Sequence, residues 1–242
     1  MTQYCSLLSF SFKGINLALA SEKGFFIGRQ DNSVRYMIFD LDNTLYPKEI
    51  GLFRLVDQRI NDYMRIRLGV DWGLVEGLRI EYMNKYGTTL GGLIVHHNID
   101  PDDYLSYVHD IDVEGFLSAN LELSVMLEKI VIEKVIFTNG SSDHAARVLN
   151  ILGINDCFSR IFDIKFLDYM AKPDPRSYEK ILDVLDAEGK ECLIVEDLER
   201  NIVPAKELGM TTVLVGEEES LYADFMIEDI LGIERVFNEI GV

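Results

Sequence analysis

The sequence is poor in the residues that build disulfide frameworks and zinc sites. It holds only Cys5, Cys157 and Cys192, an odd number with no CxxC pair. This argues against a disulfide scaffold and favours a reducing compartment, so we expect a cytoplasmic protein. The four histidines show neither an HExxH motif nor the Cys/His spacing that is typical of zinc sites.

Basic charge is also scarce, and long apolar runs are missing. Lys and Arg number 23 against 41 Asp and Glu, which gives a formal net charge of -18 at pH 7. A surface of this sign repels nucleic acid polymers and anionic membrane faces, and no apolar run reaches transmembrane length. We therefore expect a small-molecule partner, received by a local cation if it is anionic, and a monomer or homodimer.

The length of 242 residues suits one large domain, or one domain with an insert. The first thirty residues differ from the acidic remainder, because their charges are only Lys13, Glu22, Lys23 and Arg29. No positively charged stretch precedes their apolar residues, as a secretory signal would require. We interpret residues 1–33 as an N-terminal extension, with an organelle transit peptide as the alternative.

Short apolar runs alternate with helical patterns in the second half of the chain. "KVIFTNG" (134–140) and "CLIVED" (192–197) are typical of buried strands, and "TTVLVG" (211–216) is another. "DHAARVLNILG" (143–153) is typical of a helix that ends at a glycine cap. This alternation predicts an α/β fold with a Rossmann-like, doubly wound parallel sheet covered by helices on both faces.

No strand pattern is found after the first strand until the second half begins. Residues 49–121 instead show helical spacing, which predicts an all-helical cap domain of roughly seventy residues inserted after the first strand. The core then comprises residues 34–48 and 122–242. The helical spacing is clearest at Leu52, Leu55, Val56, Ile60, Tyr63 and Met64.

Polar residues follow each predicted strand, where parallel sheets place their sites. Each group has a structural explanation when it is taken alone: a turn, a helix cap or a solvated lysine. Three acids that converge in one cleft repel each other unless a divalent metal joins them, and oxygen ligands suit Mg²⁺. A hydroxyl and a lysine would then bind phosphoryl oxygens, which predicts phosphoryl-transfer chemistry. The groups that follow predicted strands are Asp40 and Asp42, Thr138 and Asn139, and Glu196 with Asp197, and Lys172 lies just before a helix that begins at Pro175.

These motifs in this order resemble the haloacid dehalogenase superfamily of phosphohydrolases, from Tyr36 onward. The stretches "FDLDNTLYP", "IFTNGSSDHAARVLNILGI", "KPDPRSYEKIL" and "VEDLERNIVPAKELGMTTVLVG" are most similar to its pyrimidine 5'-nucleotidase family. The resemblance implies a Mg²⁺-dependent phosphomonoester hydrolase that acts on UMP or CMP through an aspartyl-phosphate. The alternatives are a phosphatase of sugar phosphates or other small phosphomonoesters, a phosphomutase, and a non-catalytic binding protein of the same fold.

The resemblance also implies roles for the catalytic residues. Asp40 is the expected nucleophile. Asp42 is the expected acid and then base, which requires a pKa above that of a solvated Asp. Lys172 is expected to neutralise the phosphoryl group and Asp40. Thr138 and the main-chain amide of Asn139 are expected to bind phosphoryl oxygens.

The metal ligands and supporting residues follow from the same resemblance. Asp40, the main-chain carbonyl of Asp42, and Asp197 are expected to hold Mg²⁺. Glu196 is expected to bind it directly or through water, because Glu196-Asp197-Leu198 stands where relatives commonly have Asp-Asp-Ser. Thr44 is expected to support the loop after the nucleophile.

The cap and the loop below it should recognise the leaving group. Aromatics and histidines at helical spacing are more often part of a core or a surface, so we expect most of these side chains to serve packing. The intact acids and lysine argue against a non-catalytic protein. Asn43 stands where phosphomutases usually have glycine. The specificity candidates are Tyr46, Tyr86, Thr88, Thr89, His96, His97 and His109.

Overall fold

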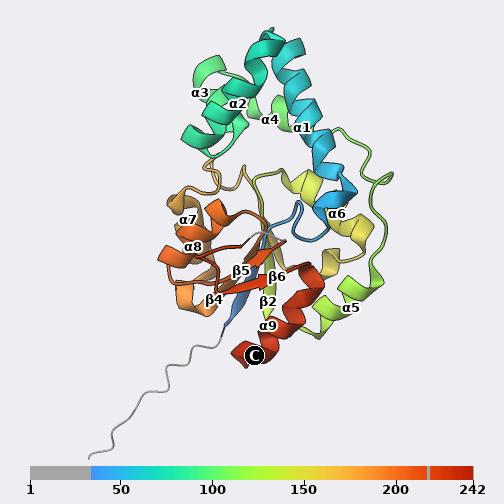
Figure 1. The fold of residues 1–242 in the computed structure, drawn as a ribbon, viewed down its shortest axis with the longest axis vertical. Helices are drawn as coiled ribbons and strands as arrows, with labels where there is room; N and C mark the ends of the chain where they lie inside the picture. The colour runs from blue at the N-terminus through green and yellow to red at the C-terminus, as the bar shows by residue number, and fades with distance from the viewer. Residues whose placement is uncertain (1–33, 217–218, 242) are drawn as a thin grey trace, which may run out of the picture. The chain divides into compact units, whose positions relative to one another are not determined.

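The computed structural model describes residues 34–216 and 219–241, and the extension predicted for residues 1–33 lies outside them. Six strands form one parallel sheet in the order β3-β2-β1-β4-β5-β6, so the predicted doubly wound sheet is confirmed (Figure 1). The strands are β1 (Tyr36–Phe39), β2 (Glu133–Phe137), β3 (Arg160–Phe162), β4 (Cys192–Glu196), β5 (Thr211–Val215) and β6 (Phe225–Ile227).

β1 is the central strand, and the direction of winding reverses beside it. Tyr36 is in register with Glu133 of β2 on one side and with Cys192 of β4 on the other. The chain first builds β2 and β3 outward and then returns to build β4, β5 and β6. The switch point therefore lies between the carboxyl ends of β1 and β4, where open α/β sheets bind ligands.

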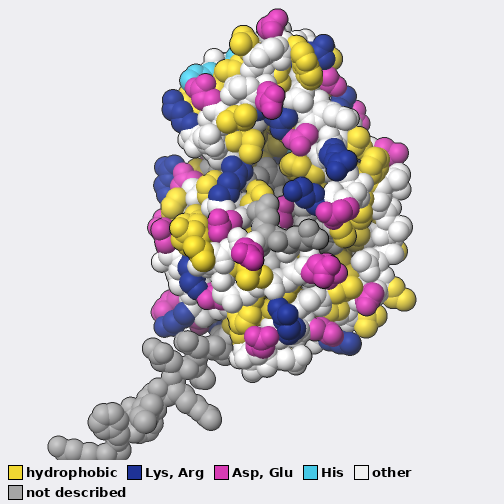
Figure 2. Space-filling model, viewed as in Figure 1, with side chains coloured by type: hydrophobic (Ala, Val, Ile, Leu, Met, Phe, Trp, Pro, Cys, Tyr) yellow, Lys and Arg dark blue, Asp and Glu magenta, His cyan; other side chains and the backbone are white. Residues whose placement is uncertain are grey.

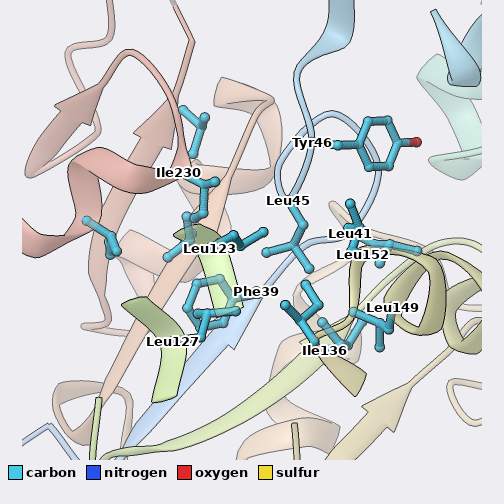
Figure 3. Packing of buried hydrophobic residues seen from close by; sticks show 14 of the residues in the cluster. Phe39, Leu41, Leu45, Tyr46, Leu123, Leu127, Ile136, Leu149, Leu152 and Ile230 are labelled. Carbon is cyan, nitrogen blue, oxygen red and sulfur yellow. The ribbon is translucent and has the colours of Figure 1, made fainter. Parts of the chain in front are cut away.

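Alternate side chains of β1 enter two hydrophobic cores, because successive residues of a strand point to opposite faces. Met37 and Phe39 belong to the core formed with α5 (Leu121–Lys129), α6 (Ser142–Leu152) and α9 (Ile233–Ile240) (Figure 3). On the other face, Ile38 packs with α7 (Pro175–Leu185) and α8 (Glu199–Glu207). Burial on both faces explains the uninterrupted apolar character of "YMIF".

Four α-helices follow β1 before α5, and no strand lies between Phe39 and Glu133. They have their own buried core, which includes Tyr63, Tyr82 and Tyr104. In Figure 1 they gather at the top of the drawing. The elements are α1 (Leu52–Asp62), a π-helical turn (Tyr63–Arg67), α2 (Trp72–Tyr86), α3 (Thr89–His97) and α4 (Pro101–Val108).

The boundaries of these helices follow from their capping residues. Asp71 accepts from the main-chain N–H of Gly73 at the start of α2, and Thr88 accepts from that of Gly91 at the start of α3. Gly87 ends α2 in the left-handed conformation, with φ of 79°, which glycine adopts without steric cost.

The surface carries charges of both signs. Figure 2 shows acidic and basic side chains interspersed on the visible face. Within the described residues, no helix combines the length and the apolar character needed to cross a bilayer.

Candidate active site

The loop after β1 presents two acids because the apolar residues between and beyond them are anchored in the core. Leu41 and Leu45 are fully buried among core side chains (Figure 3). Asp40 and Asp42 therefore face the switch point. Asn43 has φ of 64°, a left-handed conformation that Asn tolerates better than most residues, and it turns the chain back toward the core.

Lys172 is buried at the centre of the strand ends. Its Nζ lies 2.7 Å from Oδ1 of Asp40, 2.6 Å from Oε1 of Glu196 and 2.8 Å from the carbonyl oxygen of Phe137. The other oxygen of Asp40 accepts from the hydroxyl of Thr44 at 3.1 Å. Burial opposes the charge on Lys172, but the two carboxylates outweigh it and raise the lysine pKa above its ordinary value. Lys172 is therefore a fixed cation that joins β1, β2 and β4.

Both oxygens of Glu196 are engaged within the protein. Besides Lys172, Oε1 accepts from Nδ2 of Asn201 at 2.7 Å, and Oε2 accepts from the main-chain N–H of Leu198 at 3.0 Å. Oxygens of Asp40, Glu196 and Asp197 nevertheless lie within 4.8 Å of one another. Oε1 of Glu196 already accepts two hydrogen bonds, which favours contact with a metal through water. Each oxygen of Asp40 accepts one hydrogen bond, so Asp40 and Asp197 keep more capacity for direct ligation.

This acidic cluster fits a hard divalent cation. Burial and the neighbouring carboxylates raise the pKa of Asp40 to about 7 and that of Asp197 to about 8, although Lys172 opposes both shifts. Nδ2 of Asn43 lies 3.5 Å from Oδ2 of Asp197, and its Oδ1 is buried with no partner among the described residues. Carboxylates that repel one another, beside an unpaired amide oxygen, form a donor set suited to Mg²⁺.

Thr138 and Asn139, the expected phosphate-binding residues, line one cavity together with Asp40 and Lys172. The hydroxyl oxygen of Thr138 accepts from the main-chain N–H of Gly140 at 2.9 Å, which leaves its proton free to donate. The side chain of Asn139 forms two hydrogen bonds with the main chain of Lys172, at 3.1 and 2.8 Å. Asn139 thus ties the turn after β2 to the segment that carries Lys172.

Asp42 is held by two donors that the sequence did not predict. Its Oδ1 accepts from the hydroxyl of Tyr46 at 2.5 Å and lies 2.9 Å from Nε2 of His144. Burial raises the pKa of Asp42, but attraction and hydrogen bonding to His144, together with the bond from Tyr46, outweigh it and lower the pKa. The expectation of a raised Asp42 pKa is therefore wrong for the protein without bound ligand.

His144 lies against a second histidine. The rings of His109 and His144 stack with centroids 4.5 Å apart, and Nδ1 of His109 lies 3.0 Å from Oγ of Ser141. Burial and the neighbouring His144 lower the pKa of His109 to about 3. His144 could have been identified from its position in the sequence, because it lies in the first turn of α6, directly after the turn that ends β2. Side chains there point back toward the strand ends.

A cavity of about 850 Å³ joins the strand ends to the helices that follow β1. Asp40, Asp42, Thr138, Lys172 and Asp197 line its floor. Its upper wall is largely apolar and comes mostly from α1 and α2, with residues of α3 and α4. The upper-wall residues include Phe53, Val56, Ile60, Trp72, Val75, Ile80 and Met83.

The specificity candidates divide into two groups. Thr88, Thr89 and His109 line the cavity. Tyr46 does not, because it is buried and its hydroxyl serves Asp42; Figure 3 shows that hydroxyl directed away from the aliphatic cluster.

The remaining candidates, Tyr86, His96 and His97, contact side chains of α2 and α3 and do not line the cavity. Tyr86 and His96 share a hydrogen bond of 2.8 Å, and His97 lies 3.2 Å from the hydroxyl of Tyr82. His96 and His97 are exposed and neither lines the cavity. These side chains were predicted as specificity candidates from residue type alone, and tertiary packing assigns them to the surface of α2 and α3.

The fold and site together define an α/β protein that carries its acids at the ends of parallel strands. A comparison with protein families matches residues 34–209 to the family described as "Hydrolase: haloacid dehalogenase-like hydrolase". This match covers more than half of the chain, and the chain belongs to the haloacid dehalogenase-like hydrolase family.

Two curated proteins are similar to parts of this chain. The chain is 30% identical over 202 residues to "Phosphate metabolism protein 8" of Saccharomyces cerevisiae, a match that covers 76% of this chain and 62% of the yeast protein. The chain thus spans less than two thirds of that relative. In "Bifunctional epoxide hydrolase 2" of Sus scrofa the match is 35% identical over 65 residues, which covers 27% of this chain and 11% of the pig protein.

Two solved structures share the fold. CbbY from Rhodobacter sphaeroides, in complex with phosphate, superposes with a TM-score of 0.61 at 18% identity, covering 83% of this chain and 96% of that chain. A haloacid dehalogenase phosphatase from Thermococcus onnurineus gives 0.57 at 19% identity, covering 84% of this chain and 97% of that chain.

Proposed function

We propose that the protein is a Mg²⁺-dependent phosphatase of nucleoside 5'-monophosphates, with pyrimidine nucleotides as its substrates. The observation that carries this proposal is the buried Lys172, which fixes Asp40 at the floor of a cavity whose wall also holds Thr138, Asp42 and Asp197. A carboxylate held beside a cation and an acidic cluster is suited to attack a phosphorus atom whose oxygens are neutralised.

In the first step, an oxygen of Asp40 attacks phosphorus and forms an aspartyl-phosphate. The bond from phosphorus to the ester oxygen breaks, and Asp42 gives its proton to that oxygen, which leaves as the nucleoside hydroxyl. In the second step, water attacks phosphorus and gives a proton to Asp42. The bond to Asp40 breaks, and inorganic phosphate leaves.

Asp42 must be protonated for the first step although its pKa is lowered in the free protein. A phosphate dianion beside Asp42 favours protonation of its carboxyl, because like charges raise a carboxyl pKa. Substrate binding would therefore raise the Asp42 pKa toward the value that the first step requires. His144 and Tyr46 keep the carboxyl in one orientation while its charge changes.

Asp40 and Asp197 would hold Mg²⁺, with the main-chain carbonyl of Asp42 as a further ligand and Glu196 through water. When bound, Mg²⁺ supplies charge stabilisation for the phosphoryl oxygens and lowers the repulsion between the acids. Lys172 holds Asp40 and shields it from Glu196. Thr138 supplies a hydroxyl donor toward the phosphoryl oxygens.

The walls of the cavity support a nucleoside as the leaving group. Trp72 and Ile80 line the cavity although they are 62% and 54% exposed, so large apolar surface faces it. A flat base covers such surface, whereas a sugar phosphate would place hydroxyl groups against it. The resemblance of the sequence to pyrimidine 5'-nucleotidases supports the choice of base.

The proposal is tested by measuring phosphate release from UMP, CMP, AMP and several sugar phosphates, with Mg²⁺ and with a chelator. We expect turnover of UMP and CMP that the chelator abolishes. The absence of turnover on every ester would refute the phosphatase, and equal rates on UMP and AMP at limiting concentration would refute the pyrimidine preference. Asp40→Asn should abolish turnover while the protein remains folded.

A further inference from the structure

Both α1 and α2 turn one face toward the cavity. Each face is mostly apolar and also carries polar residues. On α1 the lining residues are spaced by three or four, as residues on one face of a helix must be. On α2 the lining residues follow the same spacing. The faces are Phe53, Val56, Asp57, Ile60 and Asn61 on α1, and Trp72, Val75, Glu76, Arg79, Ile80 and Met83 on α2.

Three of these polar residues form a fixed group, which we name the Asp57–Asn61–Arg79 cluster. Nη2 of Arg79 lies 2.5 Å from Oδ1 of Asp57, and Nη1 lies 2.8 Å from Oδ1 of Asn61. The guanidinium is largely buried, with 17% of the Arg79 side chain exposed, while 43% of the Asp57 side chain is exposed. Arg79 therefore holds the cluster on its buried side, and Asp57 is the member that solvent reaches most easily.

The bonds to Arg79 leave defined hydrogen-bonding groups on the cluster. Within the described residues, Oδ2 of Asp57 and Nδ2 of Asn61 take part in no hydrogen bond. Because Oδ1 of Asn61 accepts from Arg79, its Nδ2 is the remaining donor, and Oδ2 of Asp57 is the remaining acceptor. The two residues are four apart on α1, so an acceptor and a donor stand on one face of one helix.

One further polar atom of the cluster lacks a partner within the described part of the chain. Nε of Arg79 is buried without a hydrogen bond among the described residues, so the cluster does not satisfy all of its own donors. The apolar residues on either side, including the exposed Trp72 and Ile80, form the kind of surface on which an aromatic ring stacks.

We propose that the Asp57–Asn61–Arg79 cluster is the specificity determinant that recognises the hydrogen-bonding edge of the nucleobase. This inference rests on the proposed function, since the phosphate is placed at Asp40. Uracil and cytosine each carry a donor next to an acceptor on one edge, which complements the acceptor of Asp57 and the donor of Asn61. The apolar residues of α1 and α2 cover the faces of the ring.

The test compares kcat/KM for UMP with kcat/KM for phenyl phosphate, an ester whose flat leaving group has no hydrogen-bonding edge. Asn61→Asp is almost isosteric and replaces the donor by an acceptor. We expect it to lower the ratio of the two values by about tenfold or more, because an acceptor then faces the acceptor of the base where a donor had paired with it. Asp57→Asn removes the acceptor charge and should act in the same direction. Lys85→Met, on α2 but outside the cavity lining, is the matched control and should leave the ratio unchanged.

A ratio that stays unchanged in Asn61→Asp and Asp57→Asn would overturn the inference. This includes the case of an equal loss on both esters, which is expected if the cluster only joins the two helices. Binding of uridine, measured by calorimetry, does not depend on hydrolysis. Uridine should bind the wild-type protein and bind Asn61→Asp about tenfold more weakly. If no ester is hydrolysed but this difference in uridine affinity is found, the proposed function fails and the base site stands. Equal affinities would refute the base site.

Discussion

Nε2 of His144 lies 2.9 Å from Oδ1 of Asp42, the same oxygen that accepts from the hydroxyl of Tyr46. One donor comes from α6 and the other from the loop after β1, so two segments distant in the sequence fix one carboxyl group. Of these two side chains, Tyr46 was predicted in another role and His144 was not predicted.

His144→Ala should lower kcat by about tenfold or more, because Asp42 loses a donor that orients it, while Asp42→Asn should cost about a hundredfold or more. In the Asp42→Asn background, His144→Ala should have little further effect, since residues that act as a unit are not additive. Steady-state kinetics of the four proteins checks this. An equal loss in both backgrounds would show that His144 acts independently of Asp42. The exposed His96→Ala is the control.

Lys172→Met should lower the free energy of unfolding by about 3 to 5 kcal/mol, because it leaves the buried Asp40 and Glu196 without their cation. The measurement is denaturant unfolding in the presence of a chelator. Lys180→Met, which removes an ion pair to the mostly exposed Asp168, should cost less than about 1 kcal/mol. Similar losses for the two variants would contradict the central role of Lys172.

Mg²⁺ should raise the melting temperature of the protein, because a cation that binds only the folded state stabilises it. Asp197→Asn should remove this Mg²⁺-dependent rise, since it takes away one of the three carboxylates of the cluster, the one that Lys172 does not contact. Thermal unfolding with and without Mg²⁺ is the measurement. Glu207→Gln, an exposed acid on α8, is the control and should keep the full rise. A rise retained in Asp197→Asn would place the metal elsewhere.

Acid should destabilise the protein partly through His109, whose pKa falls from 6.5 to about 3 in the folded state. Between these pH values His109 is protonated in the unfolded chain but not in the folded protein. Stability therefore decreases as pH falls from 6.5 toward 3. His109→Gln should flatten this dependence, as measured by urea unfolding at a series of pH values. The exposed His97→Gln should not. A slope unchanged in His109→Gln would contradict the prediction.

Two glycine substitutions should act in opposite directions. A Cβ on Gly189 would lie 1.9 Å from the carbonyl oxygen of Leu208, so Gly189→Ala should cost about 2 kcal/mol or more. A Cβ on Gly77, inside α2, meets no atom within 4 Å, so Gly77→Ala should stabilise by about 0.5 to 1 kcal/mol. Chemical denaturation of both variants provides the comparison. Effects of the same sign would show that backbone spacing at Gly189 can relax.

The sheet and the floor of the site were predictable because they depend on local patterns and one topological rule. Apolar runs followed by polar residues identify the strand ends, and a parallel sheet brings those ends to one edge. Asp40, Thr138, Lys172 and Asp197 were therefore predicted together, and all four line one cavity.

The rest depends on packing between segments far apart in the sequence. The contact between His144 and Asp42 joins residues 102 positions apart, and the pairing of Arg79 with Asp57 depends on how two helices cross. From the sequence, Tyr46 could either contact substrate or pack in the core. The hydrogen bond from its hydroxyl to Asp42 decides between the two roles. Residue type and spacing do not distinguish these possibilities, because the deciding contact is made by another element.

Leu41 and Leu45 place the reactive loop inside the same core that holds the sheet together. A fluctuation that displaces Asp40 must therefore also open contacts around Phe39 and Ile136. Damage to the core far from the cavity is then expected to lower turnover and stability together. The geometry of the site and the cooperativity of folding therefore depend on the same core contacts.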